Sequence, residues 1–399
     1  MTQQAVREHD GYRVPVQTRS QRFASTDVAD FERPSSRELV WKNTPLKRLE
    51  PVLGELDGSP APYTADAPAG VSIAWVDRDD PRVGSSHTKP EDYVSALAWS
   101  RFERALAVDI PQDAELASPV VITRAELGST PRAAHTVITA GAHSRAIVVL
   151  ENRGEANLAE NVEIVAGPEA NLTVVTLQEW GDDAVHDAEH FIQVGRGANV
   201  RHIEVNLGGA LVRVNPSARF AGPGANVELD GVYFADAHQF LEQQVYVDHN
   251  EPNCVSRVTY KGALQGEGAR SAWVGDVLIR AEAEGTDTYE QNRNLLLTLG
   301  ARADSVPNLE IETGEIIGAG HASATGRFDE EQLFYFQARG ISEEEAKRMV
   351  VRGFLVEVIQ RIGHQPLEER LEKAIEAELY RVPLTDVEAV RGVHRAEEE

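Results

Sequence analysis

The stretch Gly195–Val200 reads Gly-Arg-Gly-Ala-Asn-Val, and Gly222–Val227 reads Gly-Pro-Gly-Ala-Asn-Val. The alanine of the first copy lies 28 residues after Ala170, and the alanine of the second copy lies a further 27 residues on. Upstream of these copies, Ala142, Ala156 and Ala170 are spaced 14 residues apart. A turn that recurs at a fixed spacing indicates structural units that stack on one another, as the coils of a β-solenoid do.

Short runs of β-branched residues accompany these turns, so we expect the repeating unit to be a strand. Val120–Thr123, Ala146–Leu150 and Val162–Val165 are such runs. An ordinary β-sandwich would also contain strands at intervals of about 8–12 residues. The regular spacing favours the solenoid, and we predict a mainly-β protein whose core, residues 116–327, is a parallel β-helix.

Helical patterns flank this core on both sides. In the N-terminal region, residues 1–115, we expect a flexible start and then a helix over Glu91–Val108, where apolar residues recur at intervals of three and four until Pro111. Residues 328–385 carry longer amphipathic patterns and are predicted to form a C-terminal helical domain. Residues 386–399 are predicted to be an acidic tail.

Composition narrows the classes of function. Among 399 residues, 39 Lys and Arg oppose 64 Asp and Glu, which gives a formal net charge of -25. This charge argues against nucleic acids and anionic membranes as partners, because binding to phosphates depends on clustered basic residues. The N-terminus is polar and no run of eighteen apolar residues occurs, so we expect a cytoplasmic protein.

The single cysteine, Cys254, excludes an intrachain disulfide and a cysteine-rich metal site. Because an iron–sulfur cluster usually needs about four thiolate ligands, this chain is not expected to hold a cluster alone. Cys254 itself is expected to be a buried or loop thiol.

A series of motifs occupies roughly the last two fifths of the chain. In order, they are Asp248-His249 with Pro252, Ser256-Arg257, Tyr260-Lys261-Gly262, Gln291–Leu297, Pro307–Ile311 and Gly320–Arg327. Together they resemble the SufB/SufD family, the scaffold subunits of the SUF iron–sulfur cluster assembly machinery, and most resemble its SufD subunit. The first third of the chain matches only loosely, through Trp41–Leu46. The resemblance implies a right-handed β-helix between two helical regions, and a non-catalytic scaffold within an ATP-driven complex.

The resemblance also singles out His321, which lies among small residues. A lone histidine beside a turn is more often structural, but the family position favours a metal ligand at the interface with a SufB-like partner chain. There His321 would complete a site for a nascent iron–sulfur cluster whose thiolate comes from the partner. Ala319 stands where the family often has cysteine, so His321 would be the sole ligand from this chain.

The same resemblance implies a second partner, a SufC-like ATPase, docked on the C-terminal helical region. This chain has no phosphate-binding Gly-x-x-x-x-Gly-Lys-Ser/Thr motif of its own. Phe334, Tyr335, Met349 and Phe354 are the candidate anchors, although all four could instead belong to the core.

Other interpretations remain open from the residues alone. The chain could be a SufB-like subunit, although one cysteine speaks against this, or a homodimeric scaffold when isolated. A β-helix carbohydrate-active enzyme would need clustered carboxylates on one face and usually an export signal. The pair Asp248 and His249 could be ligands, but turn chemistry before Pro252 also explains them. The acidic set Glu310, Glu312 and Glu315 could flank a cluster, but solvated charges on a strand are more common.

Overall fold

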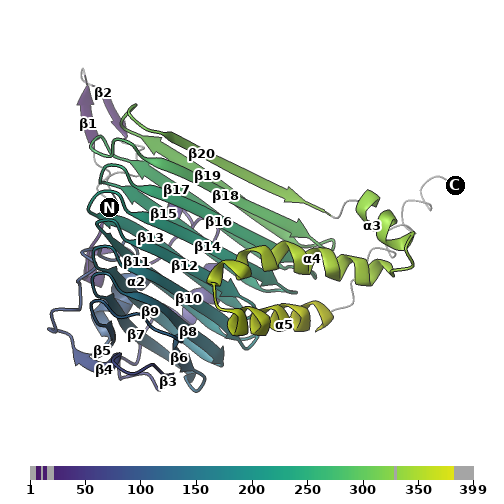
Figure 1. Ribbon diagram of the computed structural model, residues 1–399, viewed down its shortest axis with the longest axis horizontal. Coiled ribbons are helices and arrows are strands. Elements are labelled where there is room, and N and C mark those ends of the chain that lie inside the picture. The colour runs from purple at the N-terminus through teal and green to yellow at the C-terminus, as the bar shows by residue number, and fades with distance from the viewer. Residues whose placement is uncertain (1–5, 10–11, 16–21, 328–329, 382–399) are drawn as a thin grey trace.

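The computed structural model describes residues 6–9, 12–15, 22–327 and 330–381. The acidic tail predicted for residues 386–399 lies outside the described residues. Two nine-stranded sheets dominate the fold and face each other (Figure 1). Sheet I has the order β20-β18-β16-β14-β12-β10-β8-β6-β3, and sheet II has the order β19-β17-β15-β13-β11-β9-β7-β5-β4.

From β5 onward, consecutive strands alternate between the two sheets, and each strand pairs in parallel with the next strand of its own sheet, which is the arrangement of a β-solenoid. The strands of sheet I are β3 (Thr64–Asp66), β6 (Val120–Arg124), β8 (Arg145–Gly154), β10 (Asn171–Trp180), β12 (Asn199–Asn206), β14 (Asn226–Ala235), β16 (Val255–Leu264), β18 (Asp287–Leu296) and β20 (Gly318–Gly326). Those of sheet II are β4 (Ser72–Asp77), β5 (Arg104–Ile110), β7 (Gly128–Ala140), β9 (Ala156–Ala166), β11 (Val185–Gly195), β13 (Leu211–Ala221), β15 (Phe240–His249), β17 (Arg270–Ile279) and β19 (Arg302–Ile311). A separate hairpin joins β1 (Val6–His9) and β2 (Tyr12–Pro15). The predicted fold class is confirmed.

The sequence repeat has a direct structural meaning. Asn171 pairs with Asn199, and Asn199 pairs with Asn226, so 28 and 27 residues are the lengths of successive full coils. The 14-residue spacing is half a coil, the step from one sheet to the other. Ala170, Ala198 and Ala225 precede these asparagines, and all three are buried at the turn. Small side chains recur there because each turn stacks closely on the next one.

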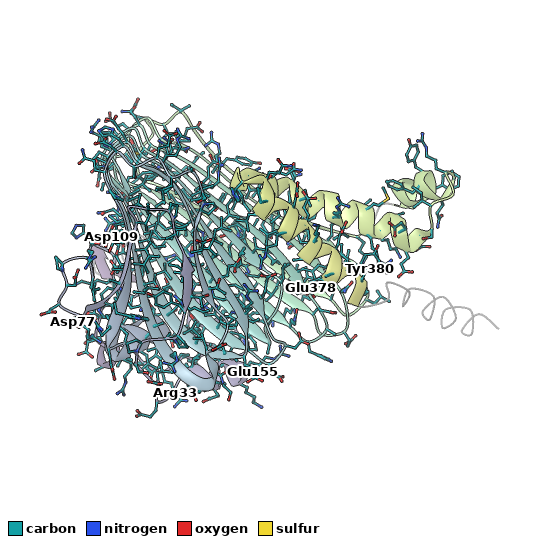
Figure 2. The ribbon with its side chains drawn as sticks, turned by 60° about the horizontal axis from the view of Figure 1, so that its bottom comes forward. Arg33, Asp77, Asp109, Glu155, Glu378 and Tyr380 are labelled. Carbon is teal, nitrogen blue, oxygen red and sulfur yellow. The ribbon has the colours of Figure 1, made fainter. Side chains whose placement is uncertain are left out.

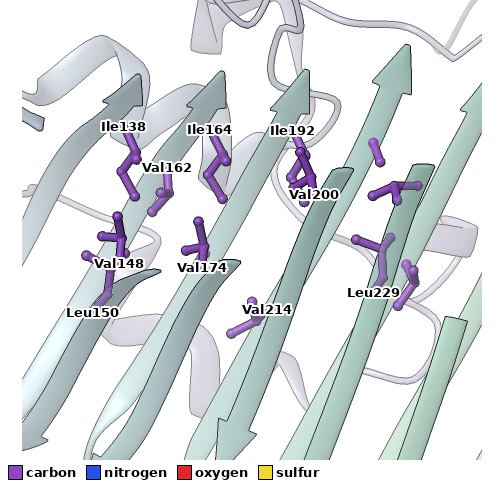
Figure 3. Close-up of a cluster of buried hydrophobic side chains, with 14 of the residues drawn as sticks. Ile138, Val148, Leu150, Val162, Ile164, Val174, Ile192, Val200, Val214 and Leu229 are labelled. Atoms are coloured by element: carbon purple, nitrogen blue, oxygen red, sulfur yellow. The ribbon is translucent and has the colours of Figure 1, made fainter. Parts of the chain in front are cut away.

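The core lies between the two sheets, and Figure 3 shows its centre. Alternate residues of each strand point inward, so valine, isoleucine and leucine from successive coils stack into continuous columns. The labelled members are Ile138, Val148, Leu150, Val162, Ile164, Val174, Ile192, Val200, Val214 and Leu229.

Beyond this apolar centre, large inward side chains face glycines on the next coil. Gly231 pairs with Tyr260, and Tyr233 pairs with Gly262. A methyl group at Gly262 would overlap the ring of Tyr233, and one at Gly231 would overlap the ring of Tyr260. The Tyr233 hydroxyl donates to Asn294 Oδ1 at 2.5 Å, so a polar network replaces apolar packing in this part of the interior.

The outer faces of the sheets are also covered. On sheet I lie α4 (Glu343–Ile359) and α5 (Gln365–Arg381), whereas α3 (Glu330–Gln337) stands clear of the sheets (Figures 1 and 2). Leu355 and Leu371 pack with Val175 and Val205 of the sheet in one buried cluster. Sheet II is covered by the N-terminal segment, which includes α1 (Leu46–Leu49) and α2 (Tyr93–Arg101). No helix among the described residues has the length and apolar character needed to span a membrane.

The helix predicted over Glu91–Val108 is only half correct. Asp92 caps α2 by accepting a hydrogen bond from Ser95 N at 2.9 Å, and the helix ends at Arg101. Residues 104–110 instead form β5, because β7 offers a parallel partner from Leu106 onward and β4 pairs along the other side. The two sheets therefore already contain strands upstream of residue 116. A short apolar pattern cannot distinguish a helix from a strand whose hydrogen-bond partners lie elsewhere in the chain.

Candidate functional site

The last coil of the solenoid carries the residue that the sequence singled out. His321 lies in the middle of β20 and pairs in register with Glu290 of β18. Both side chains are on the inward face, but no further coil of the described chain covers them. His321 is therefore 44% exposed, while Glu290, one strand deeper, is fully buried.

Glu290 and His321 form a close but incomplete pair. His321 Nδ1 lies 3.8 Å from Glu290 Oε1, which is too far for a hydrogen bond. Neither oxygen of Glu290 accepts a hydrogen bond of normal geometry from the described residues. Burial raises the pKa of Glu290 to about 8, and a backbone contact from Asn308 offsets only part of this rise. Near neutral pH the carboxyl is therefore largely protonated and can donate a hydrogen bond to an imidazole.

Glycine makes room for this carboxyl inside the solenoid. A methyl group at Gly275 would overlap both the Glu290 carboxyl and the Trp273 indole ring. Trp273 is fully buried, and its indole N–H has no partner among the described residues. The interior below His321 therefore holds polar groups without the hydrogen bonds that buried polar groups normally have.

The rim of the open end is apolar. Both terminal strands, β19 and β20, have a neighbour on one side only within the described chain. Five large apolar side chains of this region are at least two-fifths exposed, namely Tyr289, Leu299, Val306, Ile311 and Ile317. Between Leu39 and Tyr289 the described chain has no comparably exposed large apolar side chain. An exposed edge with an apolar rim is the kind of surface that pairs with another chain.

The small residues around His321 leave space above the strand. A methyl group added at Gly318 or Gly326 would meet nothing within 4 Å, so no described segment requires a glycine there. Ala319 lies two residues before His321 on the same face, is half-buried and packs on the core. The described chain groups no three His, Cys, Asp or Glu side chains as a metal site.

The other candidate residues lie elsewhere. Cys254 occupies the alanine column of the turns, is fully buried, and burial raises the pKa of its thiol, so it packs as a small apolar residue. His249 points inward, hydrogen-bonds to Ser256 Oγ at 2.9 Å, and burial lowers its pKa to about 3. Asp248 points outward and binds Arg280, so these two neighbours share no site. Glu310 lies on β19, whereas Glu312 lies in the turn before β20.

Sequence reasoning missed Glu290. The available signal was the strand Asp287–Leu296, in which Thr288, Glu290, Asn292 and Asn294 take the inward positions. An inward face composed of polar residues is unusual for a core strand, because buried polar groups cost free energy unless they are paired.

Comparison with known proteins places this solenoid in a class of iron–sulfur assembly proteins. Residues 121–354 match the SUF system FeS cluster assembly, SufBD core domain. The chain therefore belongs to the SufBD family. An iron–sulfur cluster assembly SufBD family protein of Mycobacterium bovis is 50% identical over 369 residues, which cover 90% of this chain and 92% of the relative. The corresponding protein of Mycobacterium leprae is 48% identical over 370 residues, 90% of this chain and 93% of the relative.

A more distant relative shows that one organism can have two such proteins. A second SufBD family protein of Mycobacterium bovis is 29% identical over 211 residues, which cover 53% of this chain but only 24% of that protein. The similarity to this second protein is thus confined to a part of each chain.

Proposed function

We propose that this chain is the SufD-like scaffold subunit of a SUF complex, in which it pairs with a SufB-like subunit and a SufC-like ATPase to build and transfer iron–sulfur clusters. The observation that carries the proposal is the uncovered last coil, where an exposed histidine lies inside an apolar rim. The role in iron–sulfur cluster assembly is proposed because the chain belongs to the SufBD family. The only cysteine is buried, which favours a SufD-like over a SufB-like role.

In this proposal the partner continues the solenoid beyond β19 and β20. Strand edges supply backbone hydrogen-bonding groups, and the five rim side chains would be buried on association. The open space above Gly318 and Gly326 would admit the partner's backbone. His321 would then face the partner, which would provide a thiolate.

The cluster is cargo, and His321 would hold it through a neutral ring nitrogen. When one ring nitrogen binds metal, the other carries the proton, so it would donate a hydrogen bond to an oxygen of Glu290, and this contact would fix the orientation of the imidazole. Protons compete with the metal for the imidazole, so cluster loading should weaken as pH falls.

The ATPase would dock on the helical region. Phe334 is 72% exposed and Tyr335 is 54% exposed on α3, and Met349 on α4 is 46% exposed. Their exposure suits anchors for a partner helix or groove. Phe354 is half-buried against sheet I with the Lys261 ammonium 4.8 Å from its ring centre, so its exposed part alone could reach a partner.

Co-expression with SufB-like and SufC-like partners tests both contacts. His321→Ala should leave the complex intact and lower its iron and sulfide content several-fold, because a half-exposed side chain contributes little packing energy. The double substitution Phe334→Ala and Tyr335→Ala should instead release the ATPase. The iron and sulfide content per SufB–SufD pair should then fall less than in the His321→Ala complex.

The control is His143→Asn, because His143 is 50% exposed on another coil and its φ of 58° is tolerated by asparagine. Wild-type iron and sulfide in the His321→Ala complex would show that this histidine is structural. Recovery of the chain only as a homodimer would favour the homodimeric scaffold instead.

A further inference from the structure

A cavity lies on the outer face of sheet II, away from the open end. It measures about 210 Å³. Its floor comes from two paired strands, because Ser217 and Arg219 of β13 pair in register with Tyr246 and Asp248 of β15. Two N-terminal segments cover the cavity, residues 22–24 and 87–91. A hydrogen bond of 2.9 Å from Ser25 N to Pro90 O joins these two segments, so the cavity is enclosed by three parts of the fold.

The cavity is lined by cations in a strongly acidic chain. Arg22, Lys89, Arg219 and Arg280 outnumber the two lining carboxylates, Glu91 and Asp248. These cations come from four separate stretches of sequence. A local excess of positive charge in a chain of net charge -25 is not explained by overall composition.

Several of these cations are held in place by the lining acids. Arg280 donates through Nε and Nη2 to the two oxygens of Asp248 at 2.6 and 2.9 Å. Arg22 binds Glu91 at 2.6 Å and Asp276 at 2.9 Å, and its guanidinium lies 3.9 Å from the centre of the Tyr246 ring. These contacts fix the geometry of the wall before any ligand arrives.

Arg219 has donors left over. Only its Nε approaches Asp248, at 3.2 Å, and Arg280 already occupies both oxygens of that carboxylate. The Nε of Arg219 is itself buried and forms no hydrogen bond of normal geometry with the described residues. On the same face of β13, the Ser217 hydroxyl is buried and also has no hydrogen-bond partner among the described residues. Buried polar atoms normally have partners, so these two donors indicate a missing acceptor.

We propose that this cavity binds a small multivalent oxyanion of the phosphoryl class. The planar fork of Arg219 matches two oxygens of a phosphoryl group, Lys89 adds an unbranched cation, and a bound oxygen satisfies unpaired donors of the wall. The volume suits inorganic phosphate, pyrophosphate or the phosphoryl end of a larger molecule, since whole drug-sized ligands occupy about 300–1,000 Å³. This site does not depend on His321 or on the proposed partners.

Calorimetric titration of the full chain with pyrophosphate, in phosphate-free buffer at low salt, tests the site. We expect saturable binding of one pyrophosphate per chain. Arg219→Gln should weaken the affinity by about tenfold or more, since a charge-assisted bidentate contact is lost. Lys89→Gln should weaken it less. The control Arg196→Gln should have no effect, because Arg196 is exposed and pairs with Glu169 on another turn.

Thermal unfolding without ligand checks that the variants fold; Arg219 is 39% exposed, so little change is expected. Three results would overturn the proposal. They are a lack of saturable pyrophosphate binding, an unchanged affinity in Arg219→Gln, and equal binding of malonate, which would show a general preference for anions rather than for phosphoryl groups.

Discussion

At its first coil the solenoid ends in two short strands that run antiparallel to their neighbours, β3 with three residues and β4 with six. At its last coil it ends in two long parallel strands, β19 with ten residues and β20 with nine. Figure 1 shows these pairs at opposite ends of the stack. Short terminal strands limit further pairing, whereas long terminal strands invite it.

The side chains at the two ends follow the same division. At the first coil, Tyr63 and Trp75 pack edge to face at 5.7 Å and lie against the core. Nearby, Asp77 and Asp109 carry charge on the surface of this end (Figure 2). At the last coil, Ile317 is 76% exposed and no described segment covers it. Within the described chain, one end is therefore covered, and the other end is exposed.

The largest expected difference in stability is between a buried charge in the covered part of the solenoid and an exposed charge on the last coil. Arg213 is fully buried beneath the N-terminal segment, 2.7 Å from Asp92 and 3.1 Å from Asp187, with its guanidinium 4.2 Å from the centre of the Trp41 ring. Arg213→Leu should lower the free energy of unfolding by about 3–5 kcal/mol, because it leaves buried carboxylates without a cation. The matched change Arg302→Leu, at an exposed pair of the last coil, should cost less than about 1 kcal/mol.

Denaturant unfolding near pH 7 and near pH 5 measures these effects. Burial already raises the pKa of Asp187 to about 7, and loss of Arg213 should raise it further. A carboxyl whose folded-state pKa lies above its unfolded value of about 3.8 destabilises the fold at high pH, and this penalty fades as pH falls. The deficit of Arg213→Leu should therefore shrink near pH 5. Equal losses of unfolding free energy in Arg213→Leu and Arg302→Leu would contradict the predicted difference between the covered part of the solenoid and its open end.

Two glycine substitutions sharpen the comparison at an intermediate magnitude. Gly262→Ala should destabilise the fold by about 1–3 kcal/mol, since the new methyl group overlaps the buried Tyr233 ring. Gly318→Ala should change stability by less than about 0.5 kcal/mol, because nothing lies within 4 Å of its methyl group. Thermal unfolding of both variants gives the contrast. A large loss of stability in Gly318→Ala alone would mean that the last coil is packed as tightly as the middle.

An effect that depends on pH, and is absent near pH 4.5, concerns Glu290. Its folded-state pKa of about 8 lies above the unfolded value of 4.5, so its ionisation opposes folding above pH 4.5 and this cost is complete above pH 8. Glu290→Gln should therefore be more stable than wild type at pH 8 by roughly 4 kcal/mol at most, with the difference vanishing near pH 4.5. Unfolding curves across this range test the prediction. A difference that does not change with pH would contradict the buried, protonated carboxyl.

The architecture was predictable because every coil of a solenoid repeats the same turn and strand pattern. Each turn needs a small residue at the same place, so Ala170, Ala198 and Ala225 report the length of a coil in the sequence itself. The motifs at Gln291–Leu297 and Gly320–Arg327 likewise predicted the family, which the SufBD core domain match confirms.

Other features depend on contacts that sequence periodicity does not encode. β5 is a strand because β7 supplies a parallel partner that begins some thirty residues later, so the local helical pattern was misleading. The cavity lined by Arg22, Arg219 and Arg280 joins segments that lie far apart in the chain, and no spacing rule predicts their meeting.

The sequence by itself determined the coil length, the parallel solenoid and the family, since these follow from side-chain volume and turn conformation within one repeat. Only the tertiary structure decided which of two inward-facing histidines is exposed. His249 and His321 both lie on inward faces of strands, but later coils bury His249, whereas no described coil follows His321. Exposure at the end of a stack depends on what lies next in space. Beyond the last coil, the described chain has no further strand.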